Sequence, residues 1–313
     1  MATPVSRHVG RIEAAIAGDR AAKSAVAASW TRSARLYKLD PAARMNGCRV
    51  TSADLGRARD RLGGLLPAAV PHLDRLFQLV AGLGACIVLA DPDGIVVERR
   101  GAAGDDPAFE QAGLWTGTLW SEALAGTNGI GTCLAEGRAL TIHRDQHFLA
   151  GNIGLSCSSA PIHGPDGRLQ AVLDVSTARE GLGDAVAGLI GSTVSDAARK
   201  LEADLFARHF PRARILTVPG LDRGAGALLA VDADDLVIGA TRAARQHLGL
   251  DGDLTAAPRL VADLLGLEGH DSFEAAERAV LTRALVRTSG NVSAAARALG
   301  LSRATLHRKL DRA

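Results

Sequence analysis

The sequence contains few aromatic residues. Phenylalanine, tryptophan and tyrosine make up 3% of its 313 residues, although apolar residues as a whole make up 47%. A folded core must therefore be built mainly from alanine, valine, leucine and isoleucine, and this apolar content excludes a disordered chain. The length favours two or three domains.

Long apolar runs are missing as well. No uninterrupted run approaches the length needed to cross a membrane, and residues 1–20 lack the apolar stretch of a secretory signal. These two absences predict a cytoplasmic protein with no membrane partner.

Cysteine is also scarce. The four cysteines are far apart and form no CxxC pair: Cys48, Cys86, Cys133 and Cys157. This spacing argues against a structural zinc site and favours reduced, buried thiols. His143 and His147 have the i, i+4 spacing that can hold a metal on a helix, but they follow a predicted strand and have no further ligand nearby. We therefore expect no metal, no cofactor, and structural or pocket-lining roles for both histidines.

Nucleotide-binding motifs are absent from two places where they would matter. The glycine-rich stretch GTNGIG at residues 126–131 fits neither GxGxxG after a strand nor GxxxxGK[ST], so it predicts a tight turn that leads into a helix. Residues 216–271 contain no Walker A loop, and a segment of about fifty residues is too short for an ATPase domain.

Strand-like and helix-like segments alternate along the first two thirds of the chain. Two pairs of apolar runs flank the turns DPDG and GPDG and predict hairpins over residues 85–99 and 158–175, with a short strand at 139–142. Helical patterns precede them, and an amphipathic helix is predicted over residues 183–208. We expect Trp30, Leu36 and Leu39 to anchor the N-terminal helices. The pattern predicts an α+β multidomain protein whose antiparallel sheet carries helices on one face.

This region resembles a known sensor. Residues 113–176, GLWTGTLWSEALAGTNGIGTCLAEGRALTIHRDQHFLAGNIGLSCSSAPIHGPDGRLQAVLDVS, are very similar to the GAF sensory domain of bacterial regulators of the acetoin-catabolism and glycerol-metabolism type. The preceding SWTRSARLYKLDP also resembles the N-terminal segment of that family. The resemblance implies an N-terminal helical segment (1–80), a GAF sensory domain (81–180) and a signalling or dimerisation helix (181–210).

The GAF resemblance also implies a pocket for a small-molecule effector. Candidates for its lining are residues that would be polar or aromatic in an apolar setting: Trp115, Trp120, Cys133, His143, His147 and Cys157. Each of them fits a core role equally well. Further along, residues 226–249 resemble the opening of a PAS domain, which implies a reduced PAS-like linker domain over residues 215–266.

The last two dozen residues, GNVSAAARALGLSRATLHRKLDR, predict two short helices joined by a tight turn. Asn291 or Ser293 can cap the first helix, and Gly300 can end it in the left-handed conformation. Leu306 and Leu310 stand at i and i+4 on the second helix and would face Ala296 and Leu299 of the first. This is the pattern of a helix-turn-helix, whose second helix enters the major groove of DNA.

The outer face of the second helix carries the predicted DNA contacts. Arg303 and Arg308 can pair with guanine, and Ala304 can meet a thymine methyl group. Lys309 and Arg312 are expected to contact phosphates. His307 lies at the edge of the groove, and because histidine titrates near neutral pH it predicts pH-sensitive binding. The full predicted set is Ser302, Arg303, Ala304, Thr305, His307, Arg308, Lys309 and Arg312.

With the preceding ERAVLTRALVRTS, this tail closely resembles the C-terminal DNA-binding module of Fis-type bacterial regulators. The resemblance implies a DNA-binding domain over residues 270–313 with an additional helix at about 273–288, which in such modules pairs with its copy in a dimer. Charge agrees, because residues 290–313 carry a net +4 in a chain whose formal net charge is +2.

These observations predict a homodimeric transcriptional regulator that binds double-stranded DNA and senses a small molecule. Without an ATPase of its own, it would act by occupying DNA or by contacting RNA polymerase or another regulator. One alternative is a sensor or scaffold that works through protein partners and uses the tail for dimerisation. Another is a GAF-based thiol enzyme, but no lysine or arginine neighbours Cys133 or Cys157, so an enzyme is not expected.

Overall fold

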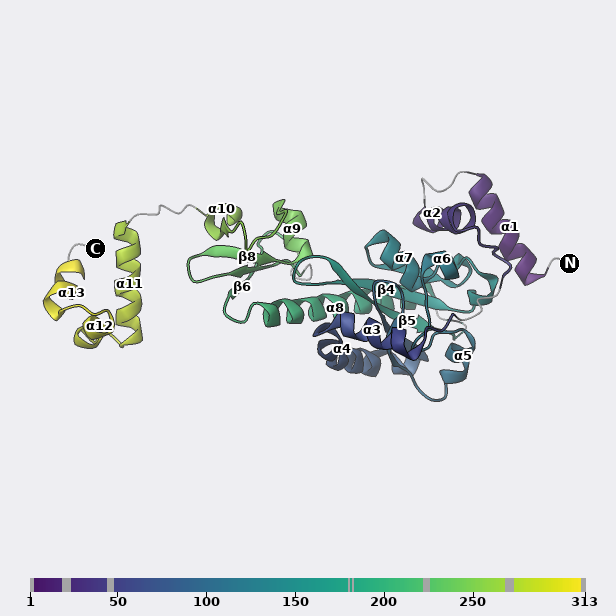
Figure 1. The fold of residues 1–313 in the computed structure, drawn as a ribbon, viewed down its shortest axis with the longest axis horizontal. Helices are drawn as coiled ribbons and strands as arrows, with labels where there is room; N and C mark the ends of the chain where they lie inside the picture. The colour runs from purple at the N-terminus through teal and green to yellow at the C-terminus, as the bar shows by residue number, and fades with distance from the viewer. Residues whose placement is uncertain are drawn as a thin grey trace. The chain divides into compact units, whose positions relative to one another are not determined.

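The computed structural model describes residues 3–18, 24–43, 48–179, 181, 183–221, 226–267 and 273–310. The chain divides into two compact units, residues 1–259 and 260–313 (Figure 1). Each unit has an apolar core of its own.

The N-terminal segment consists of α1 (Pro4–Ala17), α2 (Ala25–Thr31) and a π-helical turn, η2 (Arg32–Leu36). Trp30 is buried with Ile12 against Phe148, and Leu39 packs at the edge of the same cluster. The prediction for Leu36 was wrong, because this side chain is 65% exposed. The wider π turn adds a residue to the repeat and so rotates Leu36 out of the apolar stripe.

The central part of the first unit is a five-stranded antiparallel sheet in the order β2-β1-β5-β4-β3. The predicted hairpins form, each from a pair of consecutive strands. The strands are β1 (Ala85–Ala90), β2 (Val96–Arg100), β3 (Leu140–His143), β4 (Ser156–His163) and β5 (Leu169–Thr177).

Helices cover both faces of this sheet, whereas the sequence pattern predicted one covered face (Figure 1). On one face Ile87 and Leu89 of β1 pack in a cluster with residues of three helices: α3 (Ser52–Leu62), α4 (Leu65–Val80) and α8 (Asp184–His209). On the other face Cys86 and Val88 pack beneath three shorter helices: α5 (Asp106–Gln111), α6 (Glu122–Ala125) and α7 (Gly129–Glu136). Every residue of β1 is buried, so both of its faces need an apolar cover.

A second, smaller sheet follows α8, with strand order β6-β7-β8-β9. Its strands are β6 (Arg214–Thr217), β7 (Leu228–Val231), β8 (Leu236–Ala240) and β9 (Arg259–Leu260), and α9 (Arg242–Leu248) follows β8. Asp232 holds the β7–β8 turn by accepting hydrogen bonds from the backbone N–H groups of Asp234 and Leu236. Residues 228–248 thus form a strand, an acidic turn, a second strand and a short helix. After β9 the chain forms α10 (Val261–Leu265).

The second unit ends in three helices, α11 (Phe273–Arg287), α12 (Val292–Ala298) and α13 (Arg303–Leu310). Ala295, Ala296 and Leu306 are buried at their centre with Leu281 and Ala284 of α11. Asn291 caps α12 by accepting a hydrogen bond from Ala294 N, and Gly300 has a φ of 66°, so α12 begins and ends as predicted. Within the described ranges, no helix is both long and apolar enough to cross a membrane.

Candidate functional site

Helix α13 exposes the residues that the sequence predicted to read DNA. Its N-terminus is fixed by Ser302, whose hydroxyl accepts a hydrogen bond from Thr305 N at 3.1 Å. Leu306 is buried against α11 and α12, and the α-helical repeat therefore turns the opposite face outward. Ala304 and Arg308 lie on that outer face, and Arg303 and His307 lie on its flank; all four side chains are exposed.

Three other predicted contacts have different surroundings. The hydroxyls of Ser302 and Thr305 lie 2.8 Å apart and are engaged with each other in the cap. Lys309 is only partly exposed and forms an ion pair with Glu277 of α11. Arg312 lies outside the described residues.

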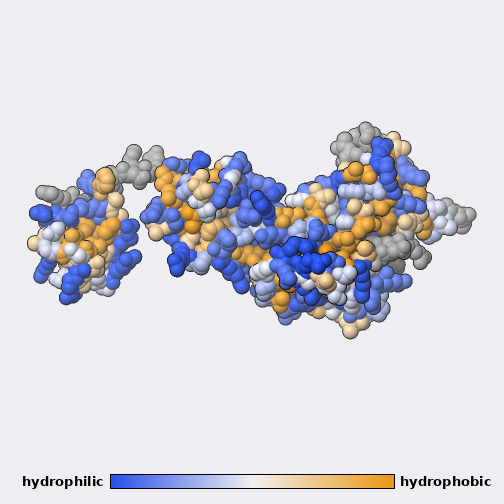
Figure 2. All heavy atoms as spheres, viewed as in Figure 1, coloured by the Kyte–Doolittle hydropathy of each residue, from blue (hydrophilic) through white to orange (hydrophobic). Residues whose placement is uncertain are grey.

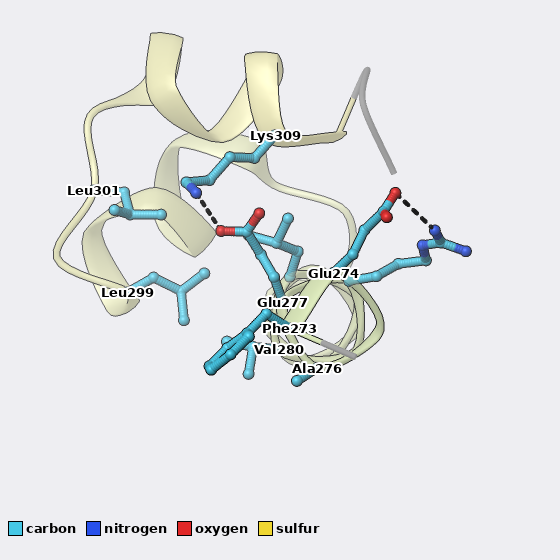
Figure 3. A pocket seen from close by; sticks show the side chains of 10 residues that line it. Phe273, Glu274, Ala276, Glu277, Val280, Leu299, Leu301 and Lys309 are labelled. Carbon is cyan, nitrogen blue, oxygen red and sulfur yellow. Dashed lines mark hydrogen bonds and ion pairs between the residues drawn. The ribbon is translucent and has the colours of Figure 1, made fainter. Parts of the chain in front are cut away.

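An apolar groove runs along α11 in the same unit (Figure 3). Its volume is about 800 Å³, and its walls come from α11, the α12–α13 turn and Lys309. Phe273 is 98% exposed, and Val280 and Ala276 are exposed beside it. In Figure 2 hydrophobic residues gather over the middle of this unit and hydrophilic residues over its rim. A surface of this kind suits contact with another helix.

Inside the first unit, a row of polar side chains lies on the sheet face beneath α7. Ser159 of β4 faces Asp174 of β5 directly across the ladder and donates a hydrogen bond to its Oδ1 at 2.5 Å. Ser176 donates to Asp174 Oδ2 at 2.6 Å. All three residues are buried. Burial raises the pKa of Asp174 to about 6, because the carboxylate loses its hydration, although the two hydroxyls oppose this shift.

Cys157 and His147 extend this row. His147 Nδ1 lies 2.9 Å from the carbonyl oxygen of Arg144, which can only accept, so Nδ1 carries the hydrogen and Nε2 is left as an acceptor. Cys157 Sγ lies 3.4 Å from that Nε2 and donates to it. Burial lowers the pKa of His147 to about 4 and raises the pKa of Cys157. The pair is therefore a neutral thiol and a neutral imidazole, which does not supply a thiolate nucleophile.

Helix α7 packs closely on this polar row. A Cβ atom at Gly129 would lie 2.6 Å from both Asp174 Oδ1 and Ser159 Oγ, so only glycine fits at the first position of the helix. Asn128 caps α7 by accepting a hydrogen bond from Gly131 N at 2.8 Å. The GTNGIG stretch is thus a tight turn that leads into a helix, as its spacing predicted.

The remaining predicted pocket residues lie around the same layer. Trp120 and Cys133 are buried in one core cluster with Cys157. Trp115 is partly buried and stacks on the Arg99 guanidinium, whose central carbon is 4.1 Å from the ring centroid. His143 on β3 is also partly buried, and its Nδ1 lies 2.8 Å from Ser156 Oγ. Among the described residues, no group of three or more His, Cys, Asp or Glu side chains is placed to hold a metal.

The sequence reasoning missed three residues of this layer: Asp174, Ser159 and Ser176. A signal was available, because Asp174 and Ser176 stand two apart on an otherwise apolar predicted strand and must share one face. Polar residues with that spacing on a fully buried strand point into the core rather than to solvent.

The N-terminal segment is tied to this layer through a buried carboxylate. Arg32 Nε lies 2.8 Å from Oε2 of Glu122, which is 3% exposed, and Arg32 Nη2 lies 2.8 Å from Glu136 Oε1. The hydroxyls of Ser29 and Thr132 also donate to Glu122. The bond to Glu122 raises the pKa of Arg32, which stays charged. This network attaches α2 to α6 and α7.

The same segment also holds the loop that carries His147. Trp30 Nε1 donates to the carbonyl of Gln146 at 2.8 Å, and His8 Nε2 donates to that of Phe148 at 3.1 Å. These two carbonyls flank His147 in the sequence. The N-terminal helices therefore fix the backbone from which His147 reaches Cys157.

Comparisons with known proteins agree with this arrangement. Residues 8–196 match the family model of the MimR N-terminal domain, and residues 272–312 match that of the Fis family of bacterial regulatory proteins. A chain in the crystal structure of the DhaR(N)-DhaL complex of E. coli has a similar fold, with a TM-score of 0.53 at 17% sequence identity over 76% of this chain and 80% of that chain.

Three curated relatives are regulators of transcription. The acetoin catabolism regulatory protein of Cupriavidus necator is 36% identical over 83% of this chain and 39% of its own length. The acetoin dehydrogenase operon transcriptional activator AcoR of Bacillus subtilis is 26% identical over 57% and 29%. The propane 2-monooxygenase operon transcriptional activator MimR of Mycolicibacterium smegmatis is 32% identical over 50% and 26%. The chain thus spans about two fifths or less of the length of these relatives.

The two family matches fall on separate parts of the chain, one on the N-terminal helices and the five-stranded sheet and the other on the three C-terminal helices. The first covers more than half of the chain and includes the polar row beneath α7, and the second covers α11 to α13. This chain belongs to the family of bacterial transcriptional regulators that carry the MimR N-terminal domain, and residues 272–312 form its Fis-type helix-turn-helix.

Proposed function

We propose that this chain is a sequence-specific DNA-binding transcriptional regulator whose GAF domain responds to a small-molecule effector. The observation that supports the proposal most strongly is the exposed side of α13, where Ala304 and Arg308 lie opposite the buried Leu306. Arg303 and His307 are exposed on one flank of the same helix. A helix with this distribution can enter the major groove while its apolar side stays in the domain.

The proposed roles follow from side-chain chemistry. Arg303 and Arg308 offer forked N–H donors to the O6 and N7 atoms of guanine, and Ala304 offers a methyl group to thymine. His307 contacts the edge of the groove. Ser302 and Thr305 position the helix N-terminus through their cap. We also propose that Arg312 contacts a phosphate, from its position in the sequence.

The proposed effector site is the buried layer beneath α7. Cys133, His147 and Cys157 already bring two thiols and a neutral imidazole together there, and Trp120 packs with them. A small molecule that enters this layer must displace α7 or the His147 loop, because Gly129 leaves no free space at the helix N-terminus. Trp115, beside β2, and His143, on β3, lie toward the two edges of the sheet and stay as candidates for the pocket lining. An effector can change the affinity for DNA only to the extent that the effector itself binds one conformation of the regulator more tightly than the other.

We assign the domains as the sequence suggested: a helical segment (1–80), the GAF domain (81–180), a signalling helix (181–210), a PAS-like linker (215–266) and the DNA-binding domain (270–313). Helix α8 supports the signalling role, because it runs from the end of the first sheet to the second as one continuous helix of 26 residues. A shift at its first turn can therefore reach the second sheet without a flexible joint.

The proposed active form is a homodimer. The groove along α11 exposes Phe273, Ala276 and Val280 on one side of the helix, and a second copy of α11 would cover them. Two DNA-binding domains would then read a palindromic site. Because residues 216–271 contain no Walker A loop, we propose that output comes from occupancy of DNA or contact with RNA polymerase or another regulator.

DNA binding tests the proposal directly. The full chain should retain genomic fragments in a gel-shift assay, and the Arg303→Ala/Arg308→Ala double variant should lose this retention at unchanged helicity. A matched control is Lys200→Ala/Arg208→Ala, which also removes two positive charges, from exposed positions on α8. If the wild-type chain binds no DNA even at low salt, where phosphate contacts are strongest, the proposal is wrong and a scaffold function becomes the better explanation.

A further inference from the structure

Lys309 and Glu277 join α13 to α11 through an ion pair (Figure 3). The carboxylate of Glu277 meets the Lys309 ammonium at the edge of the α11 groove, and the side chains of Lys309 and Glu277 are 31% and 46% exposed. The pair links residues 32 positions apart in the sequence. It therefore fixes where the ammonium points, which the sequence of α13 alone does not.

The helical repeat explains why Lys309 reaches α11 rather than the outer face. Successive residues of an α-helix are turned by about 100°. Lys309 follows the buried Leu306 by three positions, which places it about 60° from the buried direction and about 100° from Arg308. It lies on the flank beside α11, consistent with its partial burial, whereas Arg308 is exposed.

The ion pair adds little to the stability of the fold, but it directs the Lys309 ammonium toward Glu277. A partly exposed pair of this kind contributes little to stability, so it does not hold the fold together. Each lysine or arginine that neutralises a DNA phosphate, in contrast, adds about 0.9 to the slope of log affinity against log salt. Whether Lys309 is free therefore has a larger measurable effect on DNA binding than on folding.

We infer that Glu277 is a positioning residue that withholds Lys309 from the DNA backbone, and so sets both the affinity and the salt dependence of DNA binding. This inference rests on the proposed DNA-binding function and deepens it. Lys309 is then a reserve phosphate contact rather than a standing one. A change that removes the Glu277 charge frees the ammonium, which can swing toward a phosphate that α13 leaves unneutralised.

The test measures the salt dependence of binding of the full chain to duplex DNA of generic sequence, which reports phosphate contacts independently of the operator. Glu277→Gln keeps the side-chain shape and removes the charge. It should steepen the slope by about 0.9 per DNA-bound domain, which is about a threefold to fourfold gain in affinity for each fourfold dilution of salt. Glu277→Gln/Lys309→Gln should return to the wild-type slope, because it removes the pair without changing the net charge.

Glu110→Gln is the matched control. Glu110 is exposed on α5 and has no ion-pair partner among the described residues, so its substitution removes the same charge without freeing a cation. Its slope should equal that of the wild type. Far-ultraviolet circular dichroism and thermal melts check that each variant is folded.

Two outcomes would overturn the inference. One is a wild-type slope steeper by about 0.9 than that of the double variant, since Lys309 would then already contact a phosphate. The other is a slope for Glu277→Gln that matches the wild type, as a purely structural ion pair would give. If Glu277→Gln fails to fold, a wild-type slope steeper than that of the double variant still overturns the inference. If the wild-type chain binds no DNA at any salt concentration, the proposed function itself is wrong.

Discussion

Ser159 donates a hydrogen bond to Asp174 over 2.5 Å, directly across the ladder between β4 and β5. This contact lies in the interior of the first unit, on the sheet face that α7 covers. Burial without an ion-pair partner among the described residues raises the pKa of this carboxyl group, although the hydroxyls that donate to it oppose the shift.

The stability of the first unit should therefore depend on the ionisation of Asp174. Burial raises its pKa from 3.8 to about 6 in the folded state. Between these values the folded chain keeps a proton that the unfolded chain has lost, so the free energy of unfolding falls as pH rises through this window and levels off above it. The total loss is on the order of 3 kcal/mol.

Asp174→Asn removes this titration. We expect the unfolding free energy of the variant, relative to wild type, to be higher at about pH 7.5 than at about pH 4.5. Tryptophan fluorescence in a denaturant titration measures it, because all three tryptophans, Trp30, Trp115 and Trp120, lie in the first unit. If the difference in unfolding free energy between variant and wild type is the same at both pH values, the pKa of Asp174 is not raised by folding.

Arg32→Ala should loosen the N-terminal segment. It leaves the buried Glu122 carboxylate with hydroxyl partners but without its cation. Breaking a buried pair on one side costs about 3–5 kcal/mol, and since Arg32 is 30% exposed we expect a loss near the lower end. The measurement is unfolding followed by tryptophan fluorescence, together with the rate of proteolysis within α1 and α2.

The control for Arg32→Ala is Arg57→Ala. Arg57 forms an exposed pair with Asp54 one turn away on α3, and such pairs contribute little. The two variants remove the same charge from the same unit. Equal stabilities for both would show that the Arg32 network does not hold the N-terminal segment.

A charge in the α11 groove should separate the proposed dimer. Val280→Glu places a carboxylate among the apolar groove residues, and burying it against a second copy without a partner is costly. We expect sedimentation velocity to show monomers at concentrations where the wild type is dimeric. Val286→Glu is the control, because Val286 is 74% exposed and does not line the groove. If Val280→Glu is still dimeric, the dimer interface does not include the α11 groove.

The four thiols should fall into two classes. Cys48 is exposed, whereas Cys86, Cys133 and Cys157 are buried. Burial raises the pKa of Cys86 to about 12 and also raises the pKa values of the other two, so none of the three supplies a thiolate at neutral pH. A thiol reagent should therefore label one cysteine of the native chain quickly, and three more only on unfolding.

Cys48→Ser should remove the fast phase of that labelling reaction. Fast labelling that persists in this variant would reveal a reactive buried thiol and revive the possibility of thiol chemistry at Cys157.

Much of the secondary structure could be predicted from local patterns. The DPDG and GPDG turns place β1, β2, β4 and β5 to within one or two residues, because turn chemistry and alternation act over short distances. Asn291 and Gly300 likewise bound α12. The covering of both faces of β1 by helices, however, could not be predicted from its sequence, because a short apolar run does not show which elements pack against it.

The helix-turn-helix and its outward-facing residues could be predicted from the sequence, because helical periodicity fixes that Arg308 and Leu306 lie on opposite sides of one helix. Which side chains meet across long sequence separations became clear from the fold. It paired Lys309 with Glu277, and it brought His147 to Cys157 and Ser159 to Asp174. The physical reason is that periodicity constrains direction within one element, whereas contacts between elements depend on how the apolar surfaces of the whole chain pack together.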